Sequence, residues 1–307
     1  MITQKELQKA MISSRLRASQ IEKDYVISWI LAGIAQDKVL RNHLCLKGGT
    51  LLKKCYFNDY RYSEDLDFTM INGNLSETDI KNGFLRVGEF VREESGNDIS
   101  LKIDVETNHF GMMGFRIDYT SVLGGIGANK FVKFDISTTE KMISPIEERQ
   151  VFVNYSDQPI TKILCYSLEE VLSEKMCALM SREQPRDLYD FWYLLEIEGM
   201  KITDYYNSFA EKAKHKGLEP TNFLDRMRKE RITKFGRLWI ERLNNQIHID
   251  SIPVFSDVER ELGRHFRMFD EYLRKQKLLP QQSPQSPKNT PFDQFPASAT
   301  KKRGRGM

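Results

Sequence analysis

The chain of 307 residues is 29% charged and 40% hydrophobic, as is usual for a globular protein, and is long enough for one large domain or two small ones. Its formal net charge of +3 is too small to indicate nucleic-acid binding by itself. The four cysteines include no CxxC pair, which predicts a protein without disulfides. The longest apolar run covers only residues 25–35, which is too short for a membrane span, and the N-terminus lacks a signal-peptide core. We therefore expect a cytoplasmic protein.

Residues 3–57 are predicted to be mostly helical. Thr3 followed by Glu6 fits a capping box, and apolar residues between positions 21 and 31 recur at roughly helical spacing. A short strand is expected at 44–46, followed by a glycine pair and a helix that begins near Thr50.

Residues 65–70 form a predicted strand that carries two acidic side chains. Because side chains alternate along a strand, Asp65 and Asp67 point to one face, while Leu66 and Phe68 point into the core. Two adjacent carboxylates repel each other unless a divalent cation neutralises them, and hard oxygen ligands suit Mg²⁺. The alternative interpretation is a solvated edge strand with two surface acids.

The glycine pair upstream of this strand predicts a phosphate site. Gly48 and Gly49 let backbone N–H groups approach a phosphate closely, at the positive end of the helix that follows. Ser63 lies two residues before Asp65 and can share its face, where it would contact a phosphate or a ribose; a polar turn residue is equally compatible. A phosphate cradle beside a metal-binding carboxylate pair is typical of a nucleotidyltransferase.

Residues 76–137 are predicted to form one helix and then a run of strands. Ser76 is the expected N-cap of a helix over 76–91, whose apolar residues recur at spacings of four, three and four. Segments of alternating apolar and polar residues within 99–137 predict strands. The glycine-rich segment 124–129 is interpreted as a hairpin loop and not as a nucleotide-binding loop.

A third carboxylate usually completes such a metal site from a neighbouring strand. The candidates are Asp104, Asp118 and Asp135. We favour Asp135, because a charge flanked by core residues late in the sheet is the commonest place for this ligand in nucleotidyltransferases. The alternative is that Asp135 faces solvent beside Lys133.

From Ser167 onward the chain is predicted to be helical. Ser167 and Glu170 fit a second capping box, and several amphipathic helices are expected over 167–275. Asp187 and Asp190 are three residues apart and share a helix face. An acid at the start of a helix is also favoured by the helix dipole alone.

The charge runs and the C-terminal end have simple interpretations. Basic segments at 212–216, 226–237 and 301–305 most often indicate solvated helix faces or tails. Residues 279–307, which begin with a Gln/Ser/Pro-rich stretch, are predicted to be disordered because they offer little apolar surface to bury.

Five segments together resemble the AbiEii/AbiGii toxin family of nucleotidyltransferases. They are residues 21–31 (IEKDYVISWIL), 47–52 (KGGTLL), 61–68 (RYSEDLDF), 174–178 (EKMCA) and 186–194 (RDLYDFWYL). They correspond, in order, to the family's leading helix and its four motifs. The resemblance spans residues 15–200, and it is the combination of motifs that makes it specific.

The elements and the resemblance together predict an α+β fold. A nucleotidyltransferase-type mixed sheet, at about residues 40–140, would be framed by N-terminal helices and followed by a C-terminal helical domain. We expect a nucleotidyltransferase domain at 1–160, a helical domain at 161–278 and a disordered tail at 279–307.

The resemblance also implies roles for individual residues. It implies catalytic roles for Asp65, Asp67, Lys175 and Asp187, and nucleotide binding by Gly48, Gly49, Thr50, Ser63 and Lys175. Mg²⁺ binding by Asp65, Asp67 and Asp135 is predicted from the pattern of carboxylates on the strands. Lys175 could otherwise be a solvated helix lysine. In the family role its ammonium, a compact positive charge, contacts the triphosphate.

The function implied is that of a nucleoside-triphosphate-dependent toxin of a bacterial type IV toxin–antitoxin or abortive-infection system. GTP and CTP are the candidate nucleotides, a tRNA 3′ end is the expected acceptor, and a winged-helix antitoxin encoded next door is the expected partner. A non-catalytic nucleotide- or RNA-binding module and a transferase acting on a protein or small-molecule hydroxyl are the alternatives. The nucleotide, the acceptor and the oligomeric state stay open.

Overall fold

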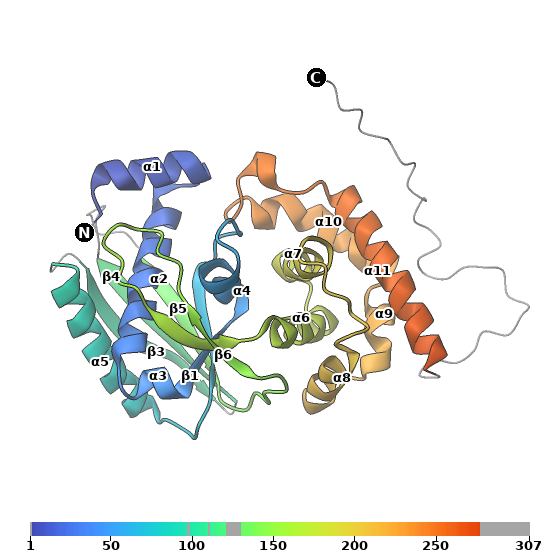
Figure 1. Ribbon diagram of the computed structural model, residues 1–307, viewed down its shortest axis with the longest axis horizontal. Helices are drawn as coiled ribbons and strands as arrows, with labels where there is room; N and C mark the ends of the chain where they lie inside the picture. The colour runs from blue at the N-terminus through green and yellow to red at the C-terminus, as the bar shows by residue number, and fades with distance from the viewer. Residues whose placement is uncertain (1, 97–98, 110, 121–129, 277–307) are drawn as a thin grey trace, which may run out of the picture. The chain divides into compact units, whose positions relative to one another are not determined.

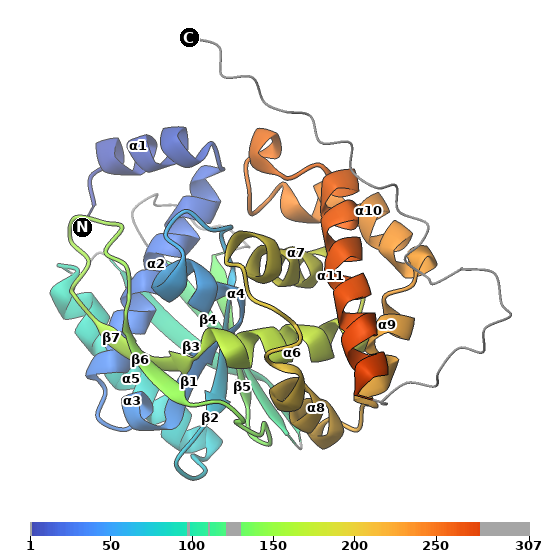
Figure 2. The ribbon, with the colours of Figure 1, turned by 45° about the vertical axis from the view of Figure 1, so that its right-hand side comes forward.

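The computed structural model describes residues 2–96, 99–109, 111–120 and 130–276 (Figures 1 and 2). The predicted hairpin loop at 124–129 and the predicted disordered tail at 279–307, with its basic segment, lie outside the described residues. The chain divides into two compact units. Unit 1 comprises Met1–Glu174 and Glu241–Ile252, and unit 2 comprises Lys175–Ile240 and the residues from Pro253 onward.

Unit 1 is built on a mixed sheet that has, among the described residues, seven strands in the order β3-β4-β5-β2-β1-β7-β6. The strands are β1 (Leu44–Lys47), β2 (Asp65–Met70), β3 (Ser100–His109), β4 (Met112–Thr120), β5 (Phe131–Ser137), β6 (Ile146–Gln150) and β7 (Lys162–Tyr166). β2 runs parallel to β5 and β1 runs parallel to β7, while the other neighbouring pairs are antiparallel. The predicted mixed sheet is therefore confirmed.

Strands β6 and β7 extend the sheet beyond the region expected from sequence, which assigned no strand to residues 138–166. β6 is an edge strand whose outer side chains are exposed, so it lacks the alternation of apolar and polar residues that identified β3, β4 and β5. β7 is a short apolar run that pairs with β1 in the interior of the sheet. Because of β7, unit 1 continues past residue 160, where we expected the first domain to end.

The helices of unit 1 surround the sheet, and one of them packs on the apolar face of its central strands. They are α1 (Gln4–Ser14), α2 (Ala18–Gln36), α3 (Leu40–His43), α4 (Gly48–Leu51), which continues as a π-helical turn over Leu52–Tyr56, and α5 (Glu77–Glu94). Phe84 of α5 packs on Phe134 of β5 with ring centroids 4.7 Å apart, and Phe68 of β2 lies 5.3 Å from the same ring. The acidic side chains that alternate with these residues therefore face the other side of the sheet.

In two predicted capping boxes only one of the two expected hydrogen bonds forms. The cap hydroxyl accepts its backbone N–H, but the glutamate carboxylate binds a residue outside the box. Thr3 accepts the backbone N–H of Glu6 at 3.1 Å, but the Glu6 carboxylate accepts the N–H of Ser156 at 2.8 Å. At the start of α6 (Leu168–Ser181), the backbone N–H of Glu170 reaches the cap hydroxyl, and its carboxylate accepts the N–H of Ser144 at 2.7 Å. In both places the glutamate hydrogen-bonds a loop that is distant in sequence to the first turn of a helix.

Unit 2 is helical and has an aromatic core. It contains the second half of α6, then α7 (Pro185–Trp192) with a π-helical turn over Tyr193–Ile197, α8 (Tyr206–His215), α9 (Phe223–Arg226), most of α10 (Lys229–Leu243) and α11 (Phe255–Lys275). Phe191, Phe223 and Phe266 are buried, and the Phe223 ring lies 5.8 Å from Phe191 and 6.1 Å from Phe266. The predicted helical character of this region is confirmed.

A buried ion pair joins α2 to the turn that follows the glycine pair. Lys54 is 1% exposed, and its ammonium donates to the Asp24 carboxylate at 2.7 Å and to the Ser28 hydroxyl at 2.8 Å. The Tyr155 hydroxyl donates to the same carboxylate at 2.8 Å. All these groups are buried, so each one depends on its partner for the hydrogen bonds it lost with water.

We predict that Lys54→Met lowers the free energy of unfolding by about 3–5 kcal/mol, because it leaves the Asp24 carboxylate buried without its cation. Urea unfolding of unit 1 measures the change. The double variant Asp24→Asn/Lys54→Met should be more stable than Lys54→Met alone. Lys81→Met, in the exposed pair that Lys81 forms with Glu77 at 3.0 Å, is the matched control. Equal losses in Lys54→Met and Lys81→Met would contradict the prediction.

Candidate active site

The carboxylates of the 65–67 motif form a row with residues of the neighbouring strands. Asp67 on β2 is the register partner of Lys47 on antiparallel β1 and of Asp135 on parallel β5. Register partners point to the same face, so Lys47, Asp67 and Asp135 stand side by side across three strands. Asp65 lies two residues before Asp67 on that face. The structure therefore brings together the three predicted metal ligands within unit 1.

Gly48 is required by the close approach of Asp67. Gly48 has φ +77°, and a Cβ added there would lie 2.6 Å from Asp67 Oδ2. At Gly49 an added Cβ would collide with the guanidinium of Arg61, which is 3% exposed and donates to Gln246 Oε1 at 2.7 Å. The glycine pair thus lets the turn sit directly against the carboxylate strand on one side and Arg61 on the other.

Thr50 and Ser63, both predicted to bind the nucleotide, flank the start of β2. The buried Thr50 hydroxyl donates to the backbone carbonyl of Asp65 at 2.5 Å, and so ties the helix after the glycine pair to the first residue of β2. Ser63 is half-buried in the extended segment before that strand. Thr50 has a positioning contact in the structure, and nucleotide binding by either residue stays a prediction.

Of the three candidates for the third carboxylate, Asp135 lies nearest to β2. Asp118 lies on β4 and pairs with Arg116 at 2.8 Å, and Asp104 lies on edge strand β3 and pairs with Lys102 at 2.7 Å. Burial and the nearby Asp65 carboxylate raise the pKa of Asp135 above its usual value. On β4, Gly114 is the register partner of Asp135, and an added Cβ there would lie 3.1 Å from Asp135 Oδ1.

The donor set fits a magnesium ion that is shared with a substrate. Within the described ranges no group of three or more His, Cys, Asp and Glu side chains is arranged to enclose a metal. Mg²⁺ is usually held by one or two carboxylates, with substrate phosphates and water completing its shell. Asp65 and Asp67 supply hard oxygen donors, and the missing side chain of Gly48 keeps room beside Asp67. These residues fit Mg²⁺.

Lys175 and Asp187, the two remaining predicted catalytic residues, lie together in unit 2. Lys175 is 7% exposed, and its ammonium contacts Asp187 Oδ1 at 2.9 Å and Asp190 Oδ2 at 2.6 Å. Both aspartates are fully buried. The interpretation of Lys175 as a solvated helix lysine is therefore wrong, and the shared face of Asp187 and Asp190 is confirmed. Contact of Lys175 with a triphosphate stays a prediction.

Arg182 completes this charged group. Its Nε and Nη2 donate to the two oxygens of Asp187 at 2.7 and 3.2 Å, a bidentate arrangement. Burial would raise the pKa of Asp187, but Lys175 and Arg182 outweigh it and hold that pKa well below its usual value. Asp187 is therefore a carboxylate fixed in its charged form.

Several charged residues that contact these groups were not predicted from the sequence. They are Lys47, Arg61, Glu140, Glu174 and Arg182. Lys47 stands directly before the glycine pair, and Arg61 opens the RxSxDxD segment, so their positions in the motifs were the available signal. Glu140 carries no such signal, because only the fold brings it to Lys47.

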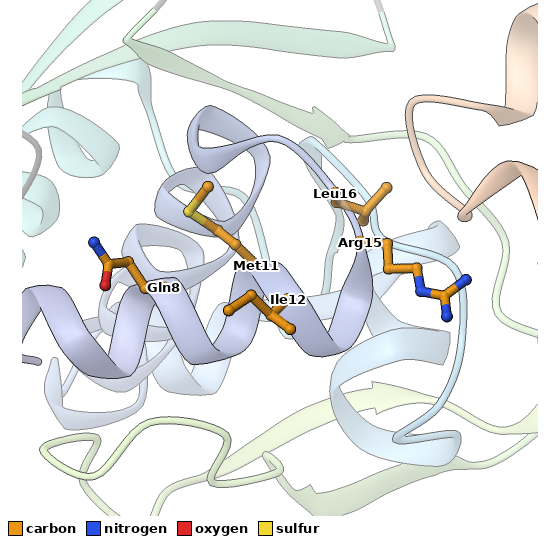
Figure 3. A pocket seen from close by; sticks show the side chains of 5 residues that line it. All are labelled: Gln8, Met11, Ile12, Arg15 and Leu16. Atoms are coloured by element: carbon orange, nitrogen blue, oxygen red, sulfur yellow. The ribbon is translucent and has the colours of Figure 1, made fainter.

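A separate pocket lies along α1 and is not part of this site. It is lined by Gln8, Met11, Ile12, Arg15 and Leu16, whose side chains project from one helix and the turn after it (Figure 3). Ile12 is 76% exposed there. The pocket contains no carboxylate and none of the predicted site residues.

The mixed sheet, the glycine turn after β1 and the aspartates on β2 define a nucleotidyltransferase-type fold. The family described as "Nucleotidyl transferase AbiEii toxin, Type IV TA system" matches residues 29–278. The chain belongs to this family of nucleotidyltransferase toxins.

Solved structures of two other proteins show the same fold. A proposed nucleotidyltransferase from H. pylori is 18% identical, with a TM-score of 0.55 over 85% of this chain and 99% of that one. MenT4, a nucleotidyltransferase toxin from Mycobacterium tuberculosis H37Rv, is 15% identical, with a TM-score of 0.54 over 90% of this chain and 99% of that one. No curated protein matches the chain by sequence. No helix within the described residues is long and apolar enough to traverse a bilayer.

We predict that Gly48→Ala impairs the site more than the same change at Gly217. Gly217 has φ +70° and no atom within 4 Å of an added Cβ, so Gly217→Ala incurs only the left-handed backbone strain of about 1 kcal/mol. Gly48→Ala adds a collision with Asp67. Urea unfolding and a nucleotide-transfer assay should both show the larger loss at Gly48. Indistinguishable stabilities would show that Asp67 can move away without cost.

We predict that Asp187→Asn lowers the free energy of unfolding by about 3 kcal/mol at pH 7, because it breaks a buried ion pair. The pKa of Asp187 is lower in the folded than in the unfolded protein. The ionised carboxylate therefore stabilises the fold at pH values above the unfolded pKa of about 3.9, and this stabilisation is lost as the pH falls from there towards the folded pKa. The difference from wild type should stay constant between about pH 5 and 7 and shrink below about pH 4. Asp225→Asn, on the surface of unit 2, is the control, and a pH-independent difference would contradict the prediction.

Proposed function

We propose that this protein transfers a nucleotide from a nucleoside triphosphate to an RNA acceptor, the 3′ end of a tRNA, with Mg²⁺. The observation that carries the proposal is the row of Asp67 and Asp135 on adjacent strands, with Asp65 on the same face and the glycine turn against Asp67. Family membership supports the transfer chemistry. GTP and CTP are the candidate nucleotides.

The residues of unit 1 suit an attack on the α-phosphorus. The 3′-hydroxyl oxygen would form a bond to that phosphorus while the bond to the bridging oxygen breaks and pyrophosphate leaves. The hydroxyl proton would pass to the carboxylate of Asp135, which lies beside Asp67 on the same face of the sheet. Backbone groups at Gly48 and Gly49 would orient the phosphates. When bound, Mg²⁺ would neutralise the charge on the triphosphate.

The choice of RNA as acceptor is supported by the charge of unit 2. On helices α9 and α10, exposed Lys and Arg side chains outnumber exposed Asp and Glu side chains. The cations include Arg226, Lys229 and Arg237. Such a local excess of positive charge suits a phosphate backbone. Family membership implies an antitoxin partner, and we propose that it is a winged-helix protein encoded by the neighbouring gene.

We predict that Asp65→Ala and Asp67→Ala each reduce nucleotide transfer to background and abolish growth inhibition. The assay incubates the protein with total RNA, each α-labelled nucleoside triphosphate and Mg²⁺. Label should enter RNA of tRNA size, and periodate oxidation of the RNA 3′ ends should prevent it. Thermal stability without metal should hold or rise, since each change relieves like-charge repulsion.

Asp118→Ala is the matched control, because this aspartate lies on the same sheet two strands from β2 and pairs with Arg116. It should retain transfer. Full transfer by Asp65→Ala or Asp67→Ala would contradict the catalytic role. Label found in protein or in a small molecule, and not in RNA, would support nucleotide transfer but contradict RNA as the acceptor.

A further inference from the structure

Lys47 is a buried cation for which the proposed reaction has no use. It ends β1, its side chain is 8% exposed, and it stands in register with Asp67. Burial lowers the pKa of Lys47, but the carboxylates of Glu174, Glu140 and Asp67 outweigh this effect and raise it above its usual value. The ammonium is therefore a permanent charge beside the carboxylate row.

The Lys47 side chain crosses the strand that carries Asp67. Its Nζ donates to Ser137 Oγ on β5 at 2.9 Å, although β2 lies between β1 and β5 in the sheet. Ser137 is the register partner of Thr69, two residues beyond Asp67, and lies two residues beyond Asp135 on its own strand. The lysine thus links β1 to β5 over β2.

Two glutamates also form ion pairs with the Lys47 ammonium. Nζ lies 3.1 Å from Glu174 Oε1 on α6 and 3.6 Å from Glu140 Oε2. The Glu140 side chain is 6% exposed and that of Glu174 is 22% exposed. Ser137 and Glu174 accept hydrogen bonds from the ammonium, and Glu140 adds an ion pair. The lysine is therefore held by the end of β5, by the residues just after it and by α6.

We propose that Lys47 is a positioning residue that fixes the spacing of Asp67 and Asp135, and so sets the affinity of this face for a divalent cation. A side chain anchored on both flanking strands limits how far β2 and β5 can shift when their carboxylates repel each other. This inference rests on the proposed function only for the use of the cation in transfer. The affinity itself can be measured without any reaction.

The test is binding of Mn²⁺ alone, followed by electron paramagnetic resonance. The double variant Lys47→Met/Glu174→Gln removes one charge of each sign, so it leaves the net charge near the carboxylates unchanged. We expect its Mn²⁺ affinity to fall roughly tenfold or more, as is usual when a residue that orients a metal ligand is lost. Ser137→Ala, which cuts the link at β5 without a charge change, should also bind more weakly than wild type.

Lys81→Met/Glu77→Gln removes a comparable pair from the exposed face of α5 and should bind Mn²⁺ as wild type does. Wild-type affinity in folded Lys47→Met/Glu174→Gln would overturn the proposal. If that variant does not fold, Ser137→Ala decides, and unchanged affinity there overturns it. Wild type that binds no Mn²⁺ would overturn this proposal and the metal-dependent function together. Wild type that binds Mn²⁺ in a Lys47-dependent way but transfers no nucleotide would refute the proposed function alone.

Discussion

The repulsion among carboxylates on one face of the sheet is the constraint on which the rest of unit 1 depends. Strand register places Asp67 and Asp135 side by side, and Asp65 lies two residues before Asp67 on the same face. Burial, together with the nearby Asp65 carboxylate, raises the pKa of Asp135 above its usual value. Such an arrangement persists because the opposite face of the same strands is closely packed, with Phe134 in contact with Phe84 and Phe68. Core packing therefore stabilises a site that is unfavourable in the absence of a cation.

Buried cations balance buried acids elsewhere in both units, and the balance is local in each case. Lys54 meets Asp24 in unit 1, and Lys175 meets Asp187 and Asp190 in unit 2. Such pairs add little net stability compared with apolar packing, but removing one partner is costly, so they favour a single arrangement of the segments that carry them. Three of these five residues come from the segments that resemble the family's four motifs. Those motifs therefore encode folding constraints as well as chemistry.

Much of unit 1 could be predicted from sequence because its signals are local. Alternation along residues 65–70 predicted a strand whose acids share a face, and the structure has β2 at Asp65–Met70. β6 escaped prediction because an edge strand need not alternate, and the partner of Lys47 at Glu140 escaped because it depends on long-range contacts. Glu6 was predicted to close a capping box, yet it binds Ser156, which is distant in sequence. Local pattern predicts elements and faces, whereas the partners of long charged side chains follow from the tertiary fold.

The most direct test of the central claim is a crystal structure of the protein with Mn²⁺ and a non-hydrolysable nucleoside triphosphate, with data collected for anomalous scattering from manganese. We expect an anomalous peak for a manganese ion that is bound by the carboxylates of Asp65 and Asp67, with the triphosphate against the Gly48–Gly49 turn. A triphosphate bound away from that turn, or a manganese ion that contacts neither aspartate, would contradict the account.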